Sequence, residues 1–470
     1  MLFNSLTFLV FFSIVFLFHR LMPTWSQRKG VLLVASYIFY AAWNPPYVVI
    51  LLFSTTLDWW LAKLIWRAAS IPKRRRLLII SLVANLGLLA FFKYDGFFLG
   101  NFSAAINVLG IDYAPPAWNI VLPVGISFYT FASLSYTIDV YRGEIDADAS
   151  FLDYALFVSF FPHLVAGPIV RARVLLPQLR TARIASRDQV GWGLTLVTMG
   201  LFCKTVMADS IFAPVADSVF TTPEQYAAVD TWAAVLGFSG QIYYDFSGYS
   251  LCAIGLALCF GFSFPDNFRH PYAARGFSDF WRRWHITLST WLRDYLYIPL
   301  GGSHHGRWQT FRNLFLTMLI GGLWHGASWM FVLWGALHGI FLVAERWIRG
   351  GENSSADNTS VHIGATLLTS LLVTLAWIPF RSHDTHTMIS ILGGLVSTHS
   401  SNHLDIFPTM LCFLAMTLTF TWHFILRDSS LEEYFAKLHG MSKFAMLAVC
   451  MVAIFLASGG DERAFIYFQF

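Results

Sequence analysis

The chain consists of long, uninterrupted apolar runs separated by short polar segments. The runs do not alternate residue by residue as half-buried strands do, and many approach the roughly 20 residues with which an α-helix crosses a bilayer. This pattern predicts an all-α polytopic membrane protein with roughly 11–13 transmembrane helices. The apolar runs are 2–18, two runs on either side of 44–46, 77–93, 119–140, 151–170, 190–210, 230–262, 311–347, 362–380, 404–426 and 441–457.

Composition supports the membrane environment. Hydrophobic residues make up 56% of the 470 residues and charged residues only 12%, whereas soluble domains carry about 25% charged residues. The net charge of +4 comes from loops and indicates no nucleic-acid partner. The sequence has no Walker loop, Rossmann glycine pattern or HExxH motif, and its five cysteines stand singly. We therefore expect no tightly bound cofactor and no metal site.

The basic residues predict how the chain is oriented. The run 2–18 has no basic start and no cleavage site, so we expect a retained first span rather than a signal peptide. Basic residues gather at 20–29 and 67–76, which the positive-inside rule assigns to the cytoplasm, whereas 97–118 is expected to be an outer loop. With no soluble domain visible, we expect one integral-membrane domain over 1–470, with its motif-bearing core at about 120–340.

Polar residues interrupt the apolar pattern in the middle of the chain. Asp245 lies among aromatic residues in "GQIYYDFSGYS", and "FSDFWRRWHITLSTWLRDYLYIPLGG" (277–302) carries five charges and a histidine. Such groups are costly at membrane depth and mark functional sites. Taken as one helix over 279–296, the second segment has a polar face that predicts a cavity wall; an interfacial helix meeting lipid headgroups is the alternative. The residues of this face are Arg282, His285, Ser289 and Arg293.

A second unusual position is the histidine of "GGLWHGASWM" (321–330), inside one of the most apolar stretches. Ser328 and several small residues follow on the face of His325, with Trp324 and Trp329 beside it. Small neighbours suit either a substrate tunnel or close helix packing. A structural histidine that donates to a backbone carbonyl is the alternative to a functional one. His338 projects to another side of the same predicted helix, so we do not expect this pair to bind one metal ion.

These segments resemble the membrane-bound O-acyltransferase (MBOAT) family, in the bacterial branch that includes the alginate acetyltransferase and the teichoic-acid D-alanyl transferase. Five segments stand in the family's order, and the resemblance covers most of the chain. They are "LPVGISFYTFASLSYTIDVYRG" (122–143), "FPHLVAGPIVR" (161–171), "QIYYDFSGYS" (241–250), "FSDFWRRWHITLSTWLRDYLYIPLGG" (277–302) and "GGLWHGASWMFVLWGALHG" (321–339).

The resemblance implies a helical bundle around a central tunnel. An activated acyl group enters from the cytoplasm, and the acceptor hydroxyl approaches from the other face. The family's essential histidine falls on His325 and its second important histidine on His285. Two positions depart from the family pattern: Thr287 stands where serine is expected, and Leu251 stands where the alginate type has an acidic residue. The departure at Leu251 concerns substrate detail rather than the histidines.

An imidazole suits the implied chemistry, because acyl transfer to a hydroxyl requires removal of the hydroxyl proton. We therefore expect His325 to be the general base. His285 would orient the acyl donor, stabilise the oxyanion or take part in a relay. The sequence shows no serine or cysteine nucleophile motif, so we expect direct transfer. The other residues expected along the substrate path are Arg282, Ser289, Arg293, Asp245, Trp324, Ser328 and Trp329.

The predicted function is therefore O-acyl transfer in a bacterial inner membrane, with acetyl as the first choice. The donor would be acetyl-CoA or an acyl carrier protein thioester, used as a co-substrate. The acceptor would be an exported polysaccharide such as alginate, peptidoglycan, or a periplasmic acyltransferase partner that completes the transfer. The alternatives are D-alanyl transfer to teichoic acid and a polysaccharide or lipid transporter. Against a transporter stands the absence of a repeat pair in the sequence.

Overall fold

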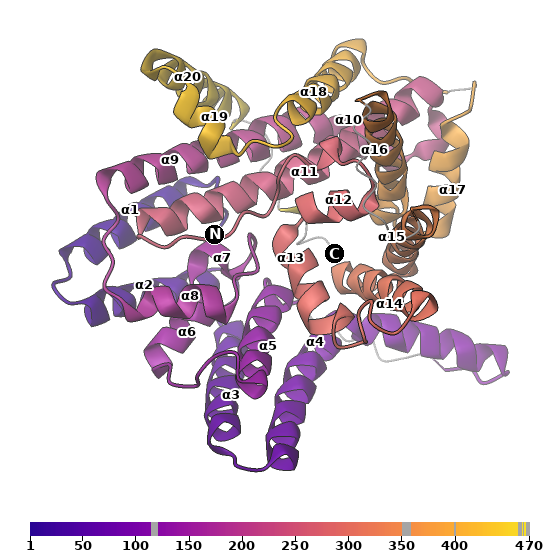
Figure 1. Ribbon diagram of the computed structural model, residues 1–470. Helices are drawn as coiled ribbons and strands as arrows, with labels where there is room; N and C mark the ends of the chain where they lie inside the picture. The colour runs from indigo at the N-terminus through magenta and orange to yellow at the C-terminus, as the bar shows by residue number, and fades with distance from the viewer. Residues whose placement is uncertain (114–120, 350–358, 399–400, 459–462, 464, 467–470) are drawn as a thin grey trace. The chain divides into compact units, whose positions relative to one another are not determined.

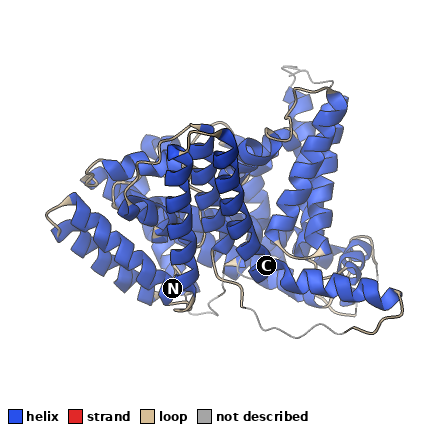
Figure 2. Ribbon diagram, turned by 90° about the horizontal axis from the view of Figure 1, so that it is seen from below, coloured by secondary structure: helices blue, strands red, loops and turns tan. Residues whose placement is uncertain are grey.

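The computed structural model describes residues 1–113, 121–349, 359–398, 401–458, 463, 465 and 466. Every regular element among these residues is a helix, and Figure 2 draws no strand among them. The predicted all-α class is confirmed. The chain divides into two compact units, the first comprising Met1–Val197 and Cys252–Pro265, the second Thr198–Leu251 and Asp266–Phe470.

Eight helical segments among the described residues are long and apolar enough to cross a membrane. The chain is therefore polytopic, although these segments are fewer than the 11–13 expected, because some apolar runs are divided into short helices. The run 151–170, for example, breaks before Pro162, whose ring cannot continue a helix from the preceding turn. The eight segments are Tyr47–Arg67, Ile71–Val108, Arg187–Thr221, Ala228–Cys259, Trp329–Ile348, His362–Arg381, Ile406–Ile425 and Gly440–Ala457.

Unit 1 contains the first eight helices and the greater part of the ninth. In it α3, α4 and α5 pack against one another, and α2 packs against α1 and α6 (Figure 1). The helices are α1 (Leu6–Leu21), α2 (Trp25–Ala41), α3 (Tyr47–Arg67), α4 (Ile71–Val108), α5 (Ile126–Arg142), α6 (Phe151–Ser159), α7 (Phe161–Leu164), α8 (Ala172–Arg180) and α9 (Arg187–Leu201).

The helix α4 changes one expectation about the loops. It has 38 residues, which at 1.5 Å per residue is about 57 Å and exceeds the roughly 30 Å apolar layer of a bilayer. The expected outer loop at 97–118 is therefore wrong as far as residue 108, because the chain stays helical until it approaches Gly110, whose φ is 78°. Residues 114–120 lie outside the described residues, and the side of the membrane stays a prediction.

A buried polar network joins α3 to α4 inside unit 1. The hydroxyl of Ser81 donates to Oδ1 of Asp58 at 2.6 Å, and the amide of Asn85 donates to Oδ2 at 2.8 Å. Ser54 completes the network by donating to the Asn85 amide oxygen at 2.8 Å. All four side chains are buried. Buried polar groups need such partners, so these residues hold the two helices together without exposing a polar group to lipid.

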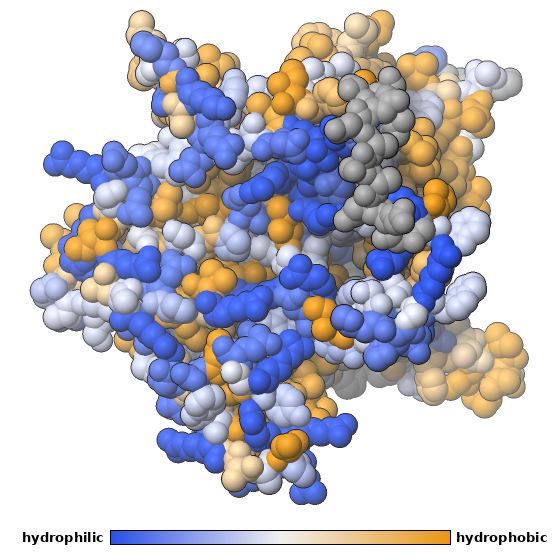
Figure 3. Space-filling view, in the orientation of Figure 1, coloured by the Kyte–Doolittle hydropathy of each residue, from blue (hydrophilic) through white to orange (hydrophobic). Residues whose placement is uncertain are grey.

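Unit 2 carries most of the later helices, and the boundaries between the units fall within α9, within α11 and in the segment between α11 and η3. Here α15 packs against α12, α14 and α16, and hydrophilic side chains gather over α12 in Figure 3. The elements are η1 (Phe202–Phe212), α10 (Ala213–Thr221), η2 (Pro223–Gln225), α11 (Ala228–Cys259), η3 (Pro271–Ala273), α12 (Phe277–Arg283), α13 (Ile286–Leu292), η4 (Arg293–Tyr297), α14 (Arg307–His325), α15 (Trp329–Ile348), α16 (Thr359–Arg381), α17 (Thr385–Gly394), α18 (Ile406–Ile425), α19 (Leu431–Lys437) and α20 (Gly440–Ala457).

Candidate functional site

The segment that contains His285 is not one helix. The helix α12 ends at Arg283 and α13 begins at Ile286, and His285 between them has φ 42° and ψ 55°, in the left-handed region. The backbone is hydrogen-bonded here to a preceding segment of the chain rather than within a helix, because the amide of Ile286 donates to the carbonyl oxygen of Asn267 at 2.9 Å. The prediction of a continuous helix over 279–296 is therefore wrong.

The break disperses the polar face predicted for that helix. Arg282 is exposed, and its Nε donates to the carbonyl oxygen of Ser278 at 3.1 Å. Arg293 is also exposed and forms an ion pair with Asp294 at 2.6 Å. Ser289 is half-buried and donates to a carbonyl oxygen of its own segment at 3.2 Å. The prediction that these residues share one helical face with the buried histidine is wrong.

His285 itself lies fully buried among aromatic rings. Its ring centroid is 4.5 Å from that of Phe246, edge to face, and 6.2 Å from that of Trp324. Burial lowers the pKa of His285 to about 3, because no water stabilises the charged form. The imidazole is therefore neutral near pH 7, so that one ring nitrogen can donate a hydrogen bond and the other can accept one.

His325 is the last residue of α14. It is 4% exposed, and its ring centroid lies 5.0 Å from Trp324, 5.0 Å from Trp334 and 5.5 Å from Phe380. The helix ends because Gly326 turns extended, with φ −163°. A Cβ atom at Gly326 would lie 2.1 Å from the Phe331 ring, so only glycine fits in this position.

The small residues after His325 allow two helices to pack closely. The chain turns after α14 and returns as α15, so Ser328 does not share a helix with His325 as predicted. Gly339, a small residue of the predicted face, packs closely on α14, since a Cβ atom there would lie 3.2 Å from the Cα atom of Phe315. At Gly335 a Cβ atom would lie 2.5 Å from the carbonyl oxygen of Met318 on α14. Of the two interpretations, the structure therefore supports close helix packing at these glycines.

Two further residues predicted for the substrate path, Ser328 and Trp329, lie at the start of α15. Ser328 caps α15, since its hydroxyl accepts the amide hydrogen of Met330 at 3.2 Å. Trp329 is the first residue of α15 and is 61% exposed. It is therefore not part of the buried surroundings of His325, and its place on the substrate path stays a prediction.

Trp324 brings the two predicted catalytic histidines together. The indole is 5% exposed, and its ring neighbours include both His285 and His325, at centroid distances of 6.2 and 5.0 Å. The histidines come from separate elements, the α12–α13 break and the end of α14. Of the nine residues predicted for the site, these three share one buried aromatic environment.

His338 extends this aromatic environment from α15. Trp334 neighbours both His325 and His338, at centroid distances of 5.0 and 4.8 Å. The two histidines thus stand on different helices, not on one straight helix as assumed. Within the described part of the chain, no group of three histidine, cysteine or acidic side chains could hold a metal ion.

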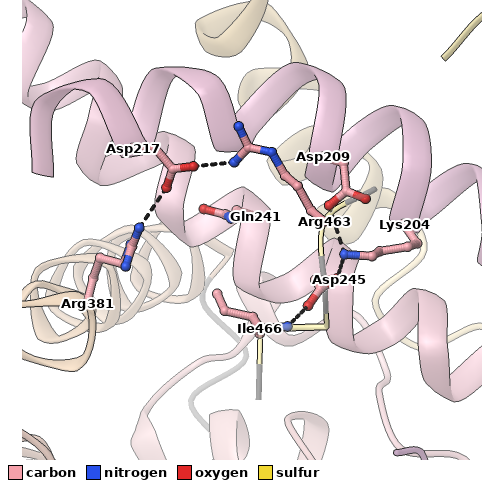
Figure 4. Close-up of a pocket in the computed structure, with 8 residues that line it drawn as sticks. All are labelled: Lys204, Asp209, Asp217, Gln241, Asp245, Arg381, Arg463 and Ile466. Carbon is pink, nitrogen blue, oxygen red and sulfur yellow. Dashed lines mark hydrogen bonds and ion pairs between the residues drawn. The ribbon is translucent and has the colours of Figure 1, made fainter. Parts of the chain in front are cut away.

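A charged cavity of about 110 Å³ lies in the same unit (Figure 4). Asp245 was predicted, whereas the other lining residues were missed. Their signal in the sequence is weak: Lys204 is a lone cation in the apolar run 190–210, and Arg381 directly follows another such run. The lining residues are Lys204, Asp209, Asp217, Gln241, Asp245, Arg381, Arg463 and Ile466.

The charges of this cavity are paired in two groups. Lys204 Nζ lies 2.8 Å from Asp209 and 2.6 Å from Asp245. Asp217 joins Arg381, at 2.7 Å, to Arg463. A buried charge is strongly destabilising unless it is paired. The first group has one cation and two carboxylates, and the second has two cations and one carboxylate, so the charges of the cavity balance only when both groups are present.

The cavity and the histidines share two short segments. Asp245 lines the cavity, and the next residue, Phe246, packs on His285. Arg381 lines the cavity, and the preceding residue, Phe380, packs on His325. A shift of Asp245 or Arg381 in the cavity would therefore also move an aromatic ring that packs on a histidine.

Comparison with known proteins supports the resemblance. Residues 141–364 match the pattern of MBOAT, the membrane-bound O-acyltransferase family. Over 398 residues the chain is 41% identical to a probable alginate O-acetylase of Pseudomonas syringae pv. tomato, an alignment covering 84% of this chain and 75% of that relative. The chain belongs to the membrane-bound O-acyltransferase family. It is a multi-pass membrane O-acyltransferase.

Two other relatives show how far the similarity of this acyltransferase extends. It is 37% identical over 427 residues to a peptidoglycan O-acetyltransferase of Helicobacter pylori, covering 84% of this chain and 80% of the relative. It is 25% identical over 280 residues to a teichoic acid D-alanyltransferase of Streptococcus thermophilus, covering 56% and 66%. The family match contains His285, Trp324 and His325, whereas Arg381 and Arg463 of the cavity lie beyond it.

Proposed function

We propose that this acyltransferase is an O-acetyltransferase of the bacterial inner membrane. It takes acetyl from a cytoplasmic thioester, acetyl-CoA or an acetylated carrier protein, and delivers it to a hydroxyl of an exported polysaccharide or of peptidoglycan. The names of the relatives support acetyl, because those at 41% and 37% identity are an O-acetylase and an O-acetyltransferase, while the D-alanyltransferase is 25% identical. A periplasmic acyltransferase partner that completes the transfer belongs to the same proposal.

The observation that carries the mechanism is the placement of His285 and His325 around Trp324. Both imidazoles are buried, so water does not compete with the substrates for their nitrogens. They come from different elements, so each can face a different part of one reacting group. This is the arrangement that a base and an oxyanion donor require in acyl transfer.

In the proposed reaction His325 accepts the proton of the acceptor hydroxyl, while the oxygen of that hydroxyl attacks the carbonyl carbon of the thioester. Neutral His285 keeps its N–H hydrogen and donates a hydrogen bond from it to the oxyanion that forms. The new C–O bond is retained, the C–S bond breaks, and His325 returns the proton to the leaving sulfur. A thioester and an alcohol become an ester and a thiol, so no net proton is released and no oxidant or metal ion is needed.

The direct test is the ester content of envelope glycans. Cells that carry the wild-type chain and cells that lack it are compared by mass spectrometry of alkali-labile groups on exported polysaccharide and on peptidoglycan. Acetyl esters that depend on the protein are expected. D-alanyl esters would replace the proposed acyl group, and transport of unmodified glycan without any new ester would support the transporter alternative.

The role of His325 is tested by His325→Ala in the same cells. Transfer is expected to fall by about 10²- to 10⁴-fold, the usual contribution of a positioned acid–base group, while membrane insertion is unchanged. His304→Ala is the control, because His304 is an exposed histidine outside the aromatic cluster. Near-normal ester content in the His325→Ala cells would remove this residue from the mechanism.

A further inference from the structure

The left-handed backbone of His285 is an unusual feature of the site. Among the described residues only His270 and His285 adopt positive φ without being glycine. L-residues with a branched or bulky side chain seldom adopt this conformation without support from their surroundings. The residues that hold the backbone at this point therefore also set the direction of the imidazole.

The ring of His285 does not supply this support itself. Neither ring nitrogen has a hydrogen-bond partner within the described part of the chain. The contacts of the ring are aromatic, with Phe246 and Trp324. Such contacts confine the ring but leave its nitrogens available to a substrate. The direction of the imidazole therefore depends on the backbone.

A neighbouring segment brackets that backbone on both sides. Before the histidine, the carbonyl oxygen of Arg283 accepts the amide hydrogen of Arg269 at 2.9 Å. After it, the amide of Ile286 donates to the carbonyl oxygen of Asn267 at 2.9 Å. His285 thus lies between two residues, Arg283 and Ile286, whose backbone groups are both hydrogen-bonded to the segment 267–269.

The side chain of Asn267 adds a second layer of bonds. Its Oδ1 accepts from the hydroxyl of Thr287 at 2.8 Å and from the amide of Thr287 at 3.3 Å. Its Nδ2 donates to the hydroxyl oxygen of Ser250 on α11 at 3.1 Å. Asn267 is 1% exposed. An amide is suited to this position, because it offers an acceptor and a donor without burying a charge.

We propose that Asn267 is the positioning residue of His285. It fixes residues 286 and 287 to α11 and thereby holds the imidazole towards the reacting acyl group. The inference rests on the proposed function, in which His285 donates to the oxyanion. Asn267 does not touch substrate in this proposal and acts only through His285. Thr287 has the complementary part, since its hydroxyl and amide both bond to the Asn267 side chain.

The kinetic test uses membrane vesicles with acetyl-labelled acetyl-CoA as the donor probe and alkali-labile label on glycan as the product. Asn267→Ala should lower kcat by about 100-fold, because a small misplacement of a catalytic group has an effect of this size. The KM for acetyl-CoA should stay within about twofold, since Asn267 does not contact the donor in this proposal. A change confined to KM would contradict the assignment.

A matched pair of variants covers the case in which Asn267→Ala does not fold. Thr287→Val is close in shape to threonine but removes the hydroxyl bond to Asn267, and kcat should fall by about tenfold, as for a partial misplacement. Thr287→Ser keeps the hydroxyl and should restore most of the lost rate. Thr369→Val is the control, because the buried Thr369 hydroxyl bonds only within its own helix, to Ala365, and no change is expected. Equal losses in Thr287→Val and Thr287→Ser would overturn the proposal.

The closing experiment separates this inference from the proposed function. Asn267→Ala is combined with His285→Ala, and the structure of Asn267→Ala is determined by electron cryomicroscopy. In the His285→Ala background the second change should have no further effect on rate, and in the single variant His285 should leave the left-handed conformation. An additive loss, or an unmoved His285, overturns the positioning role. Wild-type activity of His285→Ala with a moved residue 285 in Asn267→Ala would instead refute the catalytic role and leave the positioning role intact.

Discussion

His285 and Phe246 pack edge to face with ring centroids 4.5 Å apart. Phe246 directly follows Asp245, whose carboxylate forms an ion pair with Lys204 at 2.6 Å. The Lys204–Asp245 ion pair and the Phe246 ring that packs on His285 are therefore carried by adjacent residues of the chain. This proximity connects the stability of unit 2 with the chemistry of the acyltransferase and suggests the first experiment.

Lys204→Met should destabilise the protein by about 3–5 kcal/mol, because it leaves the buried carboxylate of Asp245 and the half-buried one of Asp209 without their cation. The measurement is the thermal unfolding midpoint of the detergent-solubilised protein. Arg180→Gln is the control: it breaks a more exposed pair with Asp148, and exposed pairs contribute about 0–1 kcal/mol. Equal midpoints for the two variants would show that the Lys204 pairs contribute no more to stability than a surface pair does.

The buried His285 makes stability depend on pH. Its pKa is about 3 in the folded protein, compared with about 6.5 in an unfolded chain. Well above pH 6.5 this imidazole is neutral in both states, and its contribution to stability does not change with pH. Below that pH the unfolded state binds a proton that the folded state excludes, so stability falls as the pH falls towards 3, by up to about 1.4 kcal/mol per unit.

His285→Asn should therefore make the unfolding midpoint fall less steeply between about pH 6.5 and pH 5. The midpoints of wild type and variant are measured in detergent over this interval. His304→Asn replaces an exposed histidine and should keep the wild-type slope. Parallel curves for wild type and His285→Asn would mean that His285 is not held neutral by burial.

Arg282 and Arg293 should differ in their effect on donor binding. Both are exposed cations that can attract an anionic thioester donor, but Arg293 is paired with Asp294 at 2.6 Å. Arg282→Gln should raise the KM for acetyl-CoA severalfold, and the effect should weaken with added salt because exposed charges are screened. Arg293→Gln should have the smaller effect. Equal KM values for wild type and Arg282→Gln, at low salt, would place the donor site elsewhere.

Gly335→Ala tests the close packing of α14 on α15. The added Cβ atom would lie 2.5 Å from the carbonyl oxygen of Met318, so the helices must separate, and overpacking of this kind costs about 1–3 kcal/mol. Acyl transfer should fall as well, since His325 ends α14 and packs on Trp334 of α15. Gly364→Ala on α16 meets nothing within 4 Å and should gain up to about 1 kcal/mol from helix propensity. Unfolding midpoints and transfer rates measure both variants.

The site residues that could be predicted were those whose own position in the sequence is unusual. His325 and Asp245 stand in apolar runs, and a polar group at membrane depth is informative without any knowledge of the fold. Both proved to be buried. His285 was predicted from the polar face of its segment and from the family resemblance; it is buried too, although it lies between two helices rather than within one.

The break at His285 could not be predicted, because its cause is distant in the sequence. The segment 279–296 contains neither glycine nor proline, so nothing local ends the helix. The interruption comes from bonds to Asn267 and Arg269, which only the fold brings alongside. The assignment of Arg282 and Arg293 to one face with His285 failed for this reason.

The charged cavity was missed on similar grounds. Its pairs join residues far apart in the sequence, such as Asp217 with Arg381 and Arg463. Each arginine stands at or beyond the end of an apolar run, where a charge is ordinary. Lys204 and Asp209 stand inside one run, but their positions do not reveal that Asp245 of the next run is a partner.

The hydrogen bond from the Ile466 amide to Asp245 spans 221 residues of sequence, and this has a consequence for biosynthesis. Lys204 and Asp245 lie on the successive apolar segments Arg187–Thr221 and Ala228–Cys259, so their charges can pair as soon as both segments have left the ribosome. Ile466 is translated long afterwards, when the segments that carry His285 and His325 have already been synthesised. During synthesis the carboxylate of Asp245 therefore pairs with Lys204 first. It accepts the hydrogen bond from the amide of Ile466 only after residue 466 has been translated.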